Sequence, residues 1–351
     1  MESTVLSACL LLLLLGWGDG AVLPPDVLDT APEPSMVELI QLFQDFMSRF
    51  NKTYSNPEEQ HRRLLIFRQN LATARALEEA GQGLAQFGVT RFSDLTEEEF
   101  RAQLLSPMPG HTLRPAAQSP SKPAPPSCDW RKAGAVTPAK DQGLCGSCWA
   151  FAAVANIESL WFIRHQDLYN LSVQQVLDCS RLQVACGGGF PWDAFTVAWM
   201  YGLTQEEQYP YIGCQSLCKS GHQAVASIKI FQFLSSDEKK LAAHIATRGP
   251  VTVGINANLL QFYVEGIITK NMTCHCNPEE INHAVLLVGY GLAPEKKTPY
   301  WIVKNSWGPE WGEEGFFRIY RGGNACGIAS LPVTAMVHEG AFDAAIESCP
   351  P

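Results

Sequence analysis

The 351-residue sequence contains no basic run, and its 26 Lys and Arg residues are outnumbered by 35 Asp and Glu, giving a formal net charge of −9. Nucleic-acid binding needs clustered positive charge, so it is excluded as the main function. After position 21 no segment is apolar enough to span a membrane, and no sequence repeat occurs. Charged residues make up only 17% of the chain and hydrophobic residues 46%, which excludes global disorder and predicts a sizeable core.

Cysteine is almost absent from the first third of the chain, where Cys9 is the only one before Cys128. Val5 to Leu15 form an apolar stretch too short to cross a bilayer, and several small residues follow up to position 21. This pattern predicts a cleaved signal peptide over residues 1–21 and entry into the secretory pathway. Of the twelve cysteines, the eleven other than Cys9 follow position 127, and an odd number in a secreted chain predicts a free thiol.

The chain changes character near position 105. Residues 105–126 are rich in proline and predict an extended linker between a leader and a cysteine-rich domain. This layout is typical of a zymogen, and two domains on a permanent linker are the alternative. The predicted division is a signal peptide over 1–21, a pro-segment with its linker over 22–126, and the main domain over 127–351.

The predicted elements place helices before strands, which favours an α+β fold. In the leader, helices are expected over 36–50 and from Pro57 to about Glu79, with a strand over Gly88 to Asp94 and a helix cap at Asp94 or Thr96. The main domain shows helical patterns at 148–164, 172–180, 191–201 and 237–248. Strand patterns follow at 251–255, 284–290, 300–304 and 316–320.

Cys148 lies where a glycine-rich turn enters a long apolar helix. A cysteine at a helix N-terminus feels the positive end of the helix dipole, and backbone N–H groups favour its thiolate. Because the thiolate is the nucleophilic form, Cys148 is the candidate nucleophile.

His283 and Asn305 are the candidate partners of Cys148. The strands predicted at 284–290 and 300–304 pair most simply as a hairpin, and these two residues are symmetric about position 294. The amide oxygen of Asn305 would then orient the imidazole of His283, and Trp307 would shield that hydrogen bond. Gln142 lies six residues before Cys148 and, with the backbone N–H of Cys148, could donate to an oxyanion.

These motifs resemble the papain family of cysteine proteases. The string Gln142-Gly-Leu-Cys-Gly-Ser-Cys-Trp-Ala-Phe matches, together with Asn282-His283-Ala and Asn305-Ser-Trp-Gly308. The resemblance extends to the leader, whose stripe follows the inhibitory pro-segment of the cathepsin F and W branch: Glu59, Arg63, Phe67, Asn70 and Ala74. Runs at 127–132, 190–195 and 348–351 point to cathepsin W, whereas the short loop between the His and Asn motifs keeps cathepsin F as the alternative.

The resemblance implies a fold and a mechanism. A helical left lobe would carry Cys148 and a barrel-like right lobe would carry His283 and Asn305, with a peptide-binding cleft between them. Catalysis would be acyl transfer by an imidazolium–thiolate pair, with Gln142 holding the oxyanion.

The resemblance also implies which residues bind the substrate. Gly188 and Gly189 would bond its backbone, and Trp307 would flank it. The positions that match the main specificity pocket are Phe190, Pro191, Gly254, Ala284 and Leu331. An apolar pocket implies preference for an apolar residue two positions before the scissile bond, with Leu331 making the pocket shallower and Gly254 leaving room.

By the same family pattern, three disulfides are expected: Cys145–Cys186, Cys179–Cys218 and Cys276–Cys326. A fourth is expected between Cys128 and Cys349, because both lie near the predicted mature termini. Cys214 and Cys274 are left over without an assigned pairing.

Other interpretations of the same residues remain open. Cys145-x-x-Cys148 could be a redox pair or half of a zinc site, and Cys274-His-Cys276 could bind metal, although neither has the expected partners. Neither a metal nor a cofactor is therefore expected. A catalytically silent binding protein on a protease scaffold is the alternative function.

Three glycosylation sequons begin at Asn51, Asn170 and Asn271. They are consistent with delivery to the lysosome or endosome, with the endoplasmic reticulum or secretion as alternatives. The expected partners of a monomeric enzyme are peptide or protein substrates, its own pro-segment and cystatin-type inhibitors. Protonation of Asp94 and of Glu97 to Glu99 is expected to release the pro-segment at low pH.

Overall fold

The structure is a computed structural model that describes residues 34–108, 124–182, 185–294, 297–338 and 348–351. The predicted signal peptide and residues 109–123 of the predicted linker lie outside the described residues. Among the helices that are described, none is both long and apolar enough to cross a membrane.

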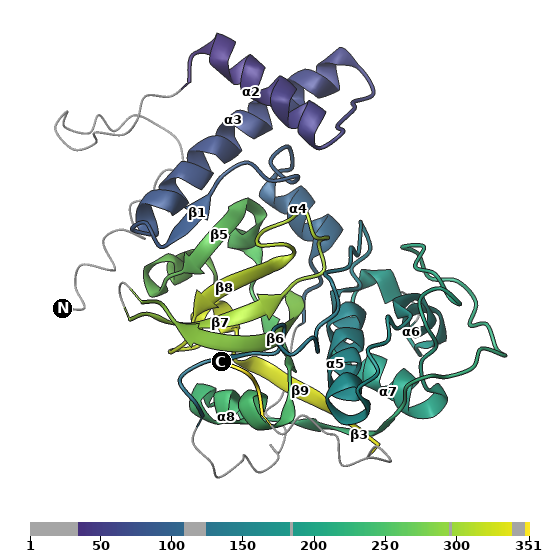
Figure 1. Cartoon of the computed structure of the whole chain (residues 1–351). Helices are drawn as coiled ribbons and strands as arrows, with labels where there is room; N and C mark the ends of the chain where they lie inside the picture. The colour runs from purple at the N-terminus through teal and green to yellow at the C-terminus, as the bar shows by residue number, and fades with distance from the viewer. Residues whose placement is uncertain (1–33, 109–123, 183–184, 295–296, 339–347) are drawn as a thin grey trace.

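A helical lobe and a sheet-rich lobe lie side by side, with the N-terminal helices above the sheet-rich lobe (Figure 1). The helical lobe contains α5 (Cys148–His165), α6 (Val173–Cys179) and α7 (Pro191–Tyr201). Helix α5 has neither glycine nor proline, and 14 of its 18 residues are buried, so it runs through the core rather than over the surface. It packs against α7 and against strands of the other lobe. The predicted α+β fold is confirmed.

The described strands form one nine-stranded sheet in the order β1-β5-β8-β7-β6-β4-β9-β3, with β2 paired to β6. Their bounds are β1 Ala85–Phe87, β2 Cys128–Asp129, β3 Ile228–Phe233, β4 Val251–Ile255, β5 Tyr263–Ile268, β6 His283–Leu292, β7 Pro299–Lys304, β8 Phe316–Tyr320 and β9 Ser330–Val337. Helix α8 (Glu238–Arg248) packs on β6, and short 3₁₀ helices lie at η2 Ala185–Gly187, η3 Asn258–Phe262, η4 Lys270–His275 and η5 Ala325–Gly327.

The β6–β7 hairpin exists, but its register differs from the symmetric one. Symmetry about position 294 would pair Ala284 with Lys304, whereas the structure pairs Leu286 with Lys304. At the site end of the hairpin this shift of two residues leaves the side chains on their expected face, because side chains alternate with a period of two, whereas beyond an irregularity between Leu287 and Gly289 the shift is three. His283 and Asn305 are therefore diagonal neighbours, not directly opposed residues.

The described part of the predicted pro-segment contains α2 (Met36–Arg49), α3 (Pro57–Ala80), β1 and α4 (Glu97–Leu104). The strand expected over Gly88 to Asp94 is wrong: residues 91–95 form turns, and the strand lies earlier, at β1. The turn is stabilised locally, because the Ser93 hydroxyl accepts a hydrogen bond from the backbone N–H of Thr90 at 3.0 Å.

Strand β1 extends the sheet of the main domain by pairing with β5. This approach depends on Gly266, which has a φ of +94° and whose missing Cβ would collide with the backbone at Leu84 and Ala85. The pro-segment is thus part of the sheet, not only a surface cover.

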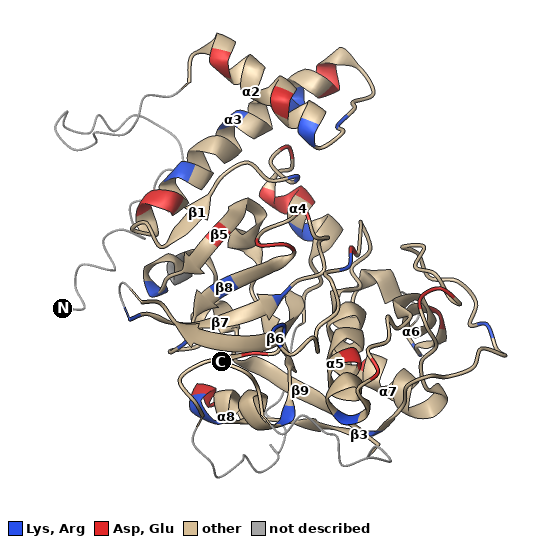
Figure 2. Ribbon diagram, in the orientation of Figure 1, with Lys and Arg blue, Asp and Glu red and all other residues tan. Residues whose placement is uncertain are grey.

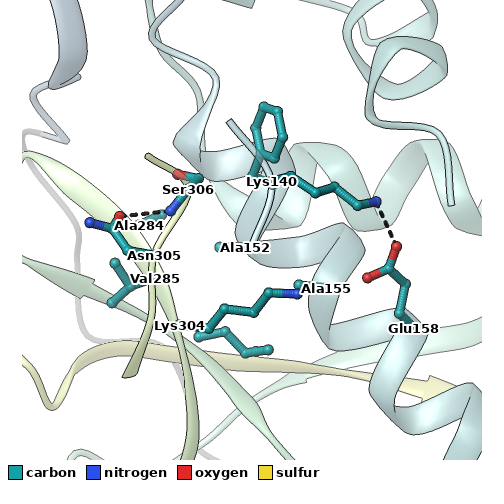
Figure 3. Close-up of a pocket in the computed structure, with 11 residues that line it drawn as sticks. Lys140, Ala152, Ala155, Glu158, Ala284, Val285, Lys304, Asn305 and Ser306 are labelled. Atoms are coloured by element: carbon teal, nitrogen blue, oxygen red, sulfur yellow. Dashed lines mark hydrogen bonds and ion pairs between the residues drawn. The ribbon is translucent and has the colours of Figure 1, made fainter. Parts of the chain in front are cut away.

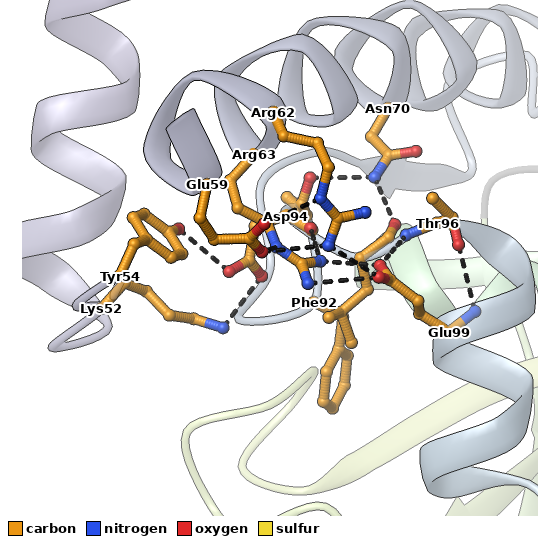
Figure 4. Close-up of polar contacts among 12 residues, drawn as sticks. Lys52, Tyr54, Glu59, Arg62, Arg63, Asn70, Phe92, Asp94, Thr96 and Glu99 are labelled. Atoms are coloured by element: carbon orange, nitrogen blue, oxygen red, sulfur yellow. Dashed lines mark hydrogen bonds and ion pairs between the residues drawn. The ribbon is translucent and has the colours of Figure 1, made fainter. Parts of the chain in front are cut away.

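Charged pairs connect the pro-segment helices to one another (Figure 4). Arg63 on α3 donates to Glu59 at 2.7 Å, and to Glu99 on α4 at 2.6 Å. Asn70 donates to the carbonyls of Ser93 and Leu95, while Lys52 and Tyr54 both bond Asp94. These groups hold α3 over the loop that leads into α4, whose first turn is acidic (Figure 2).

Pairing keeps the carboxylates of Glu59 and Glu99 ionised in mild acid. Hydrogen bonds from Arg62 and Arg63 lower the pKa of Glu59 to about 2. Burial would raise the pKa of Glu99, but the Thr96 N–H and the two arginines outweigh it and lower that pKa. A lowered carboxyl pKa contributes stability above the ordinary value of about 4.3, and this stability is lost only as the pH falls through the lowered value.

We therefore predict that the pro-segment remains bound between pH 7 and pH 5 and is released only below about pH 4. The test is a Cys148→Ala zymogen whose linker is cut with an added protease, followed by gel filtration at each pH. A Glu99→Gln variant, which mimics the protonated acid, should release its pro-segment at higher pH than the parent. Release centred near pH 6 would contradict the prediction, because it would point to a histidine.

Candidate active site

Cys148 is the first residue of α5, as the sequence predicts, and its side chain is fully buried. The turn before it is held by the Cys145–Cys186 disulfide and by a hydrogen bond from the Gly146 N–H to the Cys186 carbonyl at 2.8 Å. A Cβ at Gly146 would collide with that same carbonyl, so only glycine fits there. The turn fixes the thiol at the boundary between the lobes.

His283 and Asn305 are brought together by the hairpin. The Nε2 atom of His283 lies 2.7 Å from the Oδ1 atom of Asn305, and both residues are buried. The Trp307 ring packs over the imidazole, with centroids 4.9 Å apart, and covers this hydrogen bond. If Nε2 carries the proton, Nδ1 is left as the basic atom, and it has no hydrogen-bond partner among the described residues.

Cys148 and His283, the candidate catalytic pair, are both electrically neutral in this structure. Burial raises the pKa of the Cys148 thiol to about 11, although backbone N–H groups of Ala284 and Trp149 lower it in part. Burial also lowers the pKa of His283 to about 4, against the opposing effect of Asn305. The imidazolium–thiolate pair expected from the family resemblance is therefore not the form that this structure supports, because the charged forms would be cut off from water.

Gln142 is buried and already occupied by the pro-segment. Its Nε2 atom donates to the carbonyl of Leu104, the last residue of α4, at 3.0 Å and to the carbonyl of Cys145 at 3.0 Å. Its Oε1 atom accepts from the Ser306 hydroxyl at 2.6 Å, which sets the direction of the amide. The donor predicted for an oxyanion thus holds a carbonyl of the inhibitor, which the sequence did not reveal.

Beyond Leu104 the pro-segment continues through the cleft as an extended chain. The Ser106 N–H donates to the Asn282 carbonyl at 2.7 Å, and the Met108 N–H donates to the Ile281 carbonyl at 2.9 Å. The Ser106 hydroxyl also donates to the Gly146 carbonyl at 2.9 Å. Because main-chain bonds carry this binding, the cleft can hold an extended backbone of varied sequence.

The two glycines predicted to line the cleft differ in their surroundings. Gly188 has a φ of +121° and lies against Ser106, so the pro-segment backbone passes close to it. A Cβ at Gly189 would instead meet the Trp149 ring and Leu182. The absence of a side chain at Gly189 therefore serves the packing of the helical lobe.

The residues predicted for the specificity pocket lie in both lobes. Phe190 stacks on Trp192 with centroids 4.3 Å apart, and Pro191 is the first residue of α7. Ala284 pairs with Gly254 across β6 and β4. The room expected at Gly254 is filled, because a Cβ there would meet Ile281 at 2.6 Å and Leu331 at 3.4 Å. Ile281 was missed by the sequence analysis, and its only signal is one apolar side chain ahead of Asn282-His283.

Tyr211 is a second residue that the sequence analysis missed. Its hydroxyl donates to the Gln142 carbonyl at 2.8 Å and lies 2.8 Å from the Ser147 hydroxyl, next to the nucleophile. Its ring packs edge-on against Phe151 of α5. One hydroxyl therefore joins the two backbone segments that would supply the oxyanion donors. The Tyr-Pro-Tyr run in a polar loop is the sequence signal for it.

A buried ion network joins the lobes behind the site, around a cavity of about 20 Å³ that has room for one water (Figure 3). Glu158 on α5 accepts from Lys140 at 2.7 Å and from Thr137, which in turn accepts from Lys304 at 2.7 Å. Burial lowers the pKa of Lys304 to about 8, whereas Lys140 and Lys304 outweigh burial at Glu158 and lower its pKa. Lys304 precedes Asn305, so the network links the strand that leads to Asn305 with helix α5, which begins at Cys148.

All four expected disulfides are present: Cys128–Cys349, Cys145–Cys186, Cys179–Cys218 and Cys276–Cys326. Among the cysteines that the structure describes, Cys148 and Cys214 are free, the first buried and the second exposed. The side chain of Cys274 lies outside the described atoms. The sequon residues Asn51, Asn170 and Asn271 are all exposed. In the described part of the chain no cluster of His, Cys, Asp or Glu could hold a metal ion.

Comparison with known families agrees with this geometry. The papain family cysteine protease domain matches residues 124–336, and the cathepsin propeptide inhibitor domain (I29) matches residues 43–100. The chain therefore belongs to the papain family of cysteine proteases and carries the family's inhibitory propeptide.

Individual relatives cover nearly the whole chain. Mouse cathepsin W is 43% identical over 372 residues, covering 99% of this chain and 98% of the relative. Mouse cathepsin F is 43% identical over 316 residues, covering 88% of this chain and 68% of the relative. Among solved structures, the recombinant stem bromelain precursor has a TM-score of 0.78 at 32% identity, covering 86% and 99%. Procathepsin L 3 of the Tenebrio molitor larval midgut has a TM-score of 0.76 at 35% identity, covering 86% of this chain and 100% of that structure's chain.

The neutral state of Cys148 predicts its reactivity. With a pKa of about 11, the thiol is only ~10⁻⁴ ionised at pH 7, so the intact zymogen should react with iodoacetamide at a negligible rate. The processed enzyme should react faster by orders of magnitude. A Cys214→Ser background removes the exposed thiol, and mass spectrometry locates the label. Equal rates before and after processing would contradict the burial argument.

The contacts of Tyr211 predict a kinetic effect. Tyr211→Phe keeps the ring but leaves the Gln142 carbonyl without its donor, so kcat should fall about tenfold with little change in KM. The control is a double-mutant cycle with Gln142→Ala. If Tyr211 acts through Gln142, its substitution should have little further effect in that background. A full tenfold loss in both backgrounds would show that Tyr211 acts elsewhere.

Proposed function

We propose that the processed chain hydrolyses peptide bonds through Cys148 as nucleophile, with His283 as acid and base and Asn305 as the group that orients His283. The observation that carries the proposal is the buried 2.7 Å contact of His283 with Asn305 beneath Trp307. In the same structure, the backbone N–H of the next residue, Ala284, is directed at the Cys148 sulfur. A base oriented in this way beside a helix-terminal thiol is suited to acyl transfer.

The proposed reaction has two stages. The Cys148 thiol transfers its proton to Nδ1 of His283, and the sulfur forms a bond to the peptide carbonyl carbon. Gln142 and the backbone N–H of Cys148 hold the resulting oxyanion, and His283 protonates the departing amine. Water, deprotonated by His283, then attacks the thioester and releases the carboxylic product with the free thiol.

The pro-segment is proposed to inhibit by occupying this machinery. The Leu104 carbonyl takes the amide of Gln142, and the residues after it fill the cleft by main-chain hydrogen bonds. Exclusion of water also keeps Cys148 and His283 neutral. Removal of the pro-segment would restore water and substrate together, which favours the charged pair.

The proposal extends to the processing of the chain and its location in the cell. Residues 1–21 would be removed as a signal peptide and residues 22–126 as pro-segment and linker, leaving a peptidase domain over 127–351. Four disulfides and three exposed sequons support passage through the secretory pathway. The lysosome or endosome is the proposed destination, and protein substrates and cystatin-type inhibitors are the proposed partners of the monomer.

The direct test compares Cys148→Ala, His283→Ala and Asn305→Ala with the parent after processing. We expect kcat/KM on a peptide with an apolar residue two positions before the scissile bond to fall by about 10⁴-fold or more for the first two. Asn305→Ala should lose roughly 10²-fold, because only the orientation of the base is removed.

Labelling with a thiol-directed epoxide distinguishes this proposal from the alternative that the chain is a catalytically silent binding protein. The processed parent should take one epoxide at Cys148, and His283→Ala should take it far more slowly. A correctly processed and folded parent that neither cleaves peptides nor takes the label would establish the silent alternative.

A further inference from the structure

Asp141 is a charged residue of the main domain that the catalytic scheme leaves unused. The guanidinium of pro-segment residue Arg91 contacts both of its carboxylate oxygens, Nη1 with Oδ2 at 2.5 Å and Nη2 with Oδ1 at 2.9 Å. This is the bidentate geometry in which arginine recognises a carboxylate most strongly. The Asp141 side chain is nevertheless 42% exposed, so the pair lies at the rim of the cleft.

The position of Asp141 relative to the catalytic residues follows from the backbone. It directly precedes Gln142 and forms an antiparallel bridge with Trp307. Trp307 is two residues after Asn305 and packs on the imidazole of His283. Asp141 is therefore adjacent in the chain to the proposed oxyanion donor Gln142, and its bridge partner Trp307 is two residues from the proposed orienting group Asn305.

The path of the pro-segment shows on which side of the nucleophile Asp141 lies. Phe92 and Phe100 both pack on Trp307, with centroids at 5.4 Å. The chain then contacts Gln142 through the Leu104 carbonyl. At Met108, the last described residue of this stretch, its N–H donates to the carbonyl of Ile281, and the Ile281 side chain fills the space over Gly254. The specificity pocket and Asp141 thus lie at opposite ends of this path, and Asp141 is on the side where the leaving amine of a substrate departs.

The carboxylate is also held in place without Arg91. Its Oδ1 atom accepts from the Gly143 N–H at 2.9 Å, so the side chain stays oriented when the pro-segment leaves. Burial would raise the pKa of Asp141, but hydrogen bonding and charge from Arg91 outweigh it and lower that pKa. Once Arg91 is gone, the hydrogen bond from the Gly143 N–H still favours the charged form of the carboxylate.

We propose that, in the processed enzyme, Asp141 binds a basic side chain on the leaving-group side of the scissile bond and makes the enzyme select peptides with Arg or Lys there. In the zymogen, Arg91 occupies this site as a built-in ligand. The inference rests on the proposed function, because it assigns a substrate preference to the same cleft.

The test uses peptides that differ only in one leaving-side residue. Arginine is compared with citrulline, which has the same shape without the charge, at the first and then the second position after the scissile bond. The full-length zymogen is processed with an added protease, and kcat/KM is measured. At one of the two positions the parent should prefer arginine about fivefold, and the preference should shrink in high salt.

Three variants assign the preference to Asp141. Asp141→Asn keeps an oxygen for the Gly143 N–H but removes the charge, so the ratio of kcat/KM for the arginine peptide to that for the citrulline peptide should fall to about one. Asp141→Glu keeps the charge and should retain at least part of the preference. Asp167→Asn, an exposed residue just beyond α5, changes the net charge equally and should leave the preference intact.

Two outcomes overturn the proposal: no preference for arginine at either position in the parent, or an undiminished preference in a folded Asp141→Asn variant. If no peptide is cleaved at all, the proposed function fails. The role of Asp141 is then tested separately by measuring peptide binding. Processed Cys148→Ala should bind the arginine peptide about fivefold more tightly than the citrulline peptide, and Cys148→Ala with Asp141→Asn should bind both equally. Equal binding to Cys148→Ala alone would show that Arg91 and Asp141 serve only pro-segment docking.

Discussion

The candidate active site exists only where the two lobes meet, and helix α5 is the element on which this meeting depends. Cys148 begins the helix, while His283 and Asn305 belong to the sheet that packs against it. A helix buried on almost every side cannot slide without opening cavities, so tight packing sets the position of the thiol. Behind it, Glu158, Lys140 and Lys304 join the same helix to the same hairpin by buried charges. Because an unpaired buried charge is costly, this network resists separation of the lobes.

The pro-segment binds within the junction between the two lobes and contacts residues of the candidate site directly. It adds β1 to the sheet, packs two phenylalanines on Trp307, and presents the Leu104 carbonyl to Gln142. Its third effect is electrostatic, because exclusion of water keeps the thiol and the imidazole uncharged. The pro-segment buries the site, and this burial has two effects: the Gln142 amide is occupied, and Cys148 and His283 stay uncharged.

Much of the architecture could be predicted because its patterns are local. The apolar run of α5 and the strands β4 and β8 were located within a residue or two, since periodicity and the absence of breakers specify them. Strands β5 and β9 were missed because Gly266 and Pro332 interrupt their patterns. The hairpin register differed by two residues, which changed the pairing of Asn305 but not the face on which it lies.

The residues proposed as nucleophile, base and orienting amide could likewise be chosen from sequence, because each has a short motif and a simple geometric relation to the others. The contacts of Gln142 with Leu104 and with Tyr211 join residues 38 and 69 positions apart, and the Arg91–Asp141 pair joins residues 50 apart. No local pattern specifies such contacts, since they arise only when separate segments fold against one another.

The Cys128–Cys349 disulfide has a consequence for the chain once it has been cut. Cys128 is the second residue of the proposed peptidase domain, and Cys349 lies beyond β9, so the bond would tie the amino terminus of the processed chain to the segment that follows the last described strand. The Asp129 N–H also donates to the Pro350 carbonyl at 2.8 Å, which adds the last residues to the edge of the fold. Exopeptidases need a loose chain end to begin trimming. Among other peptidases, the processed enzyme would therefore present an amino terminus that is tied to the segment around Cys349, and its durability would depend on the reducing power of its surroundings as well as on the stability of its core.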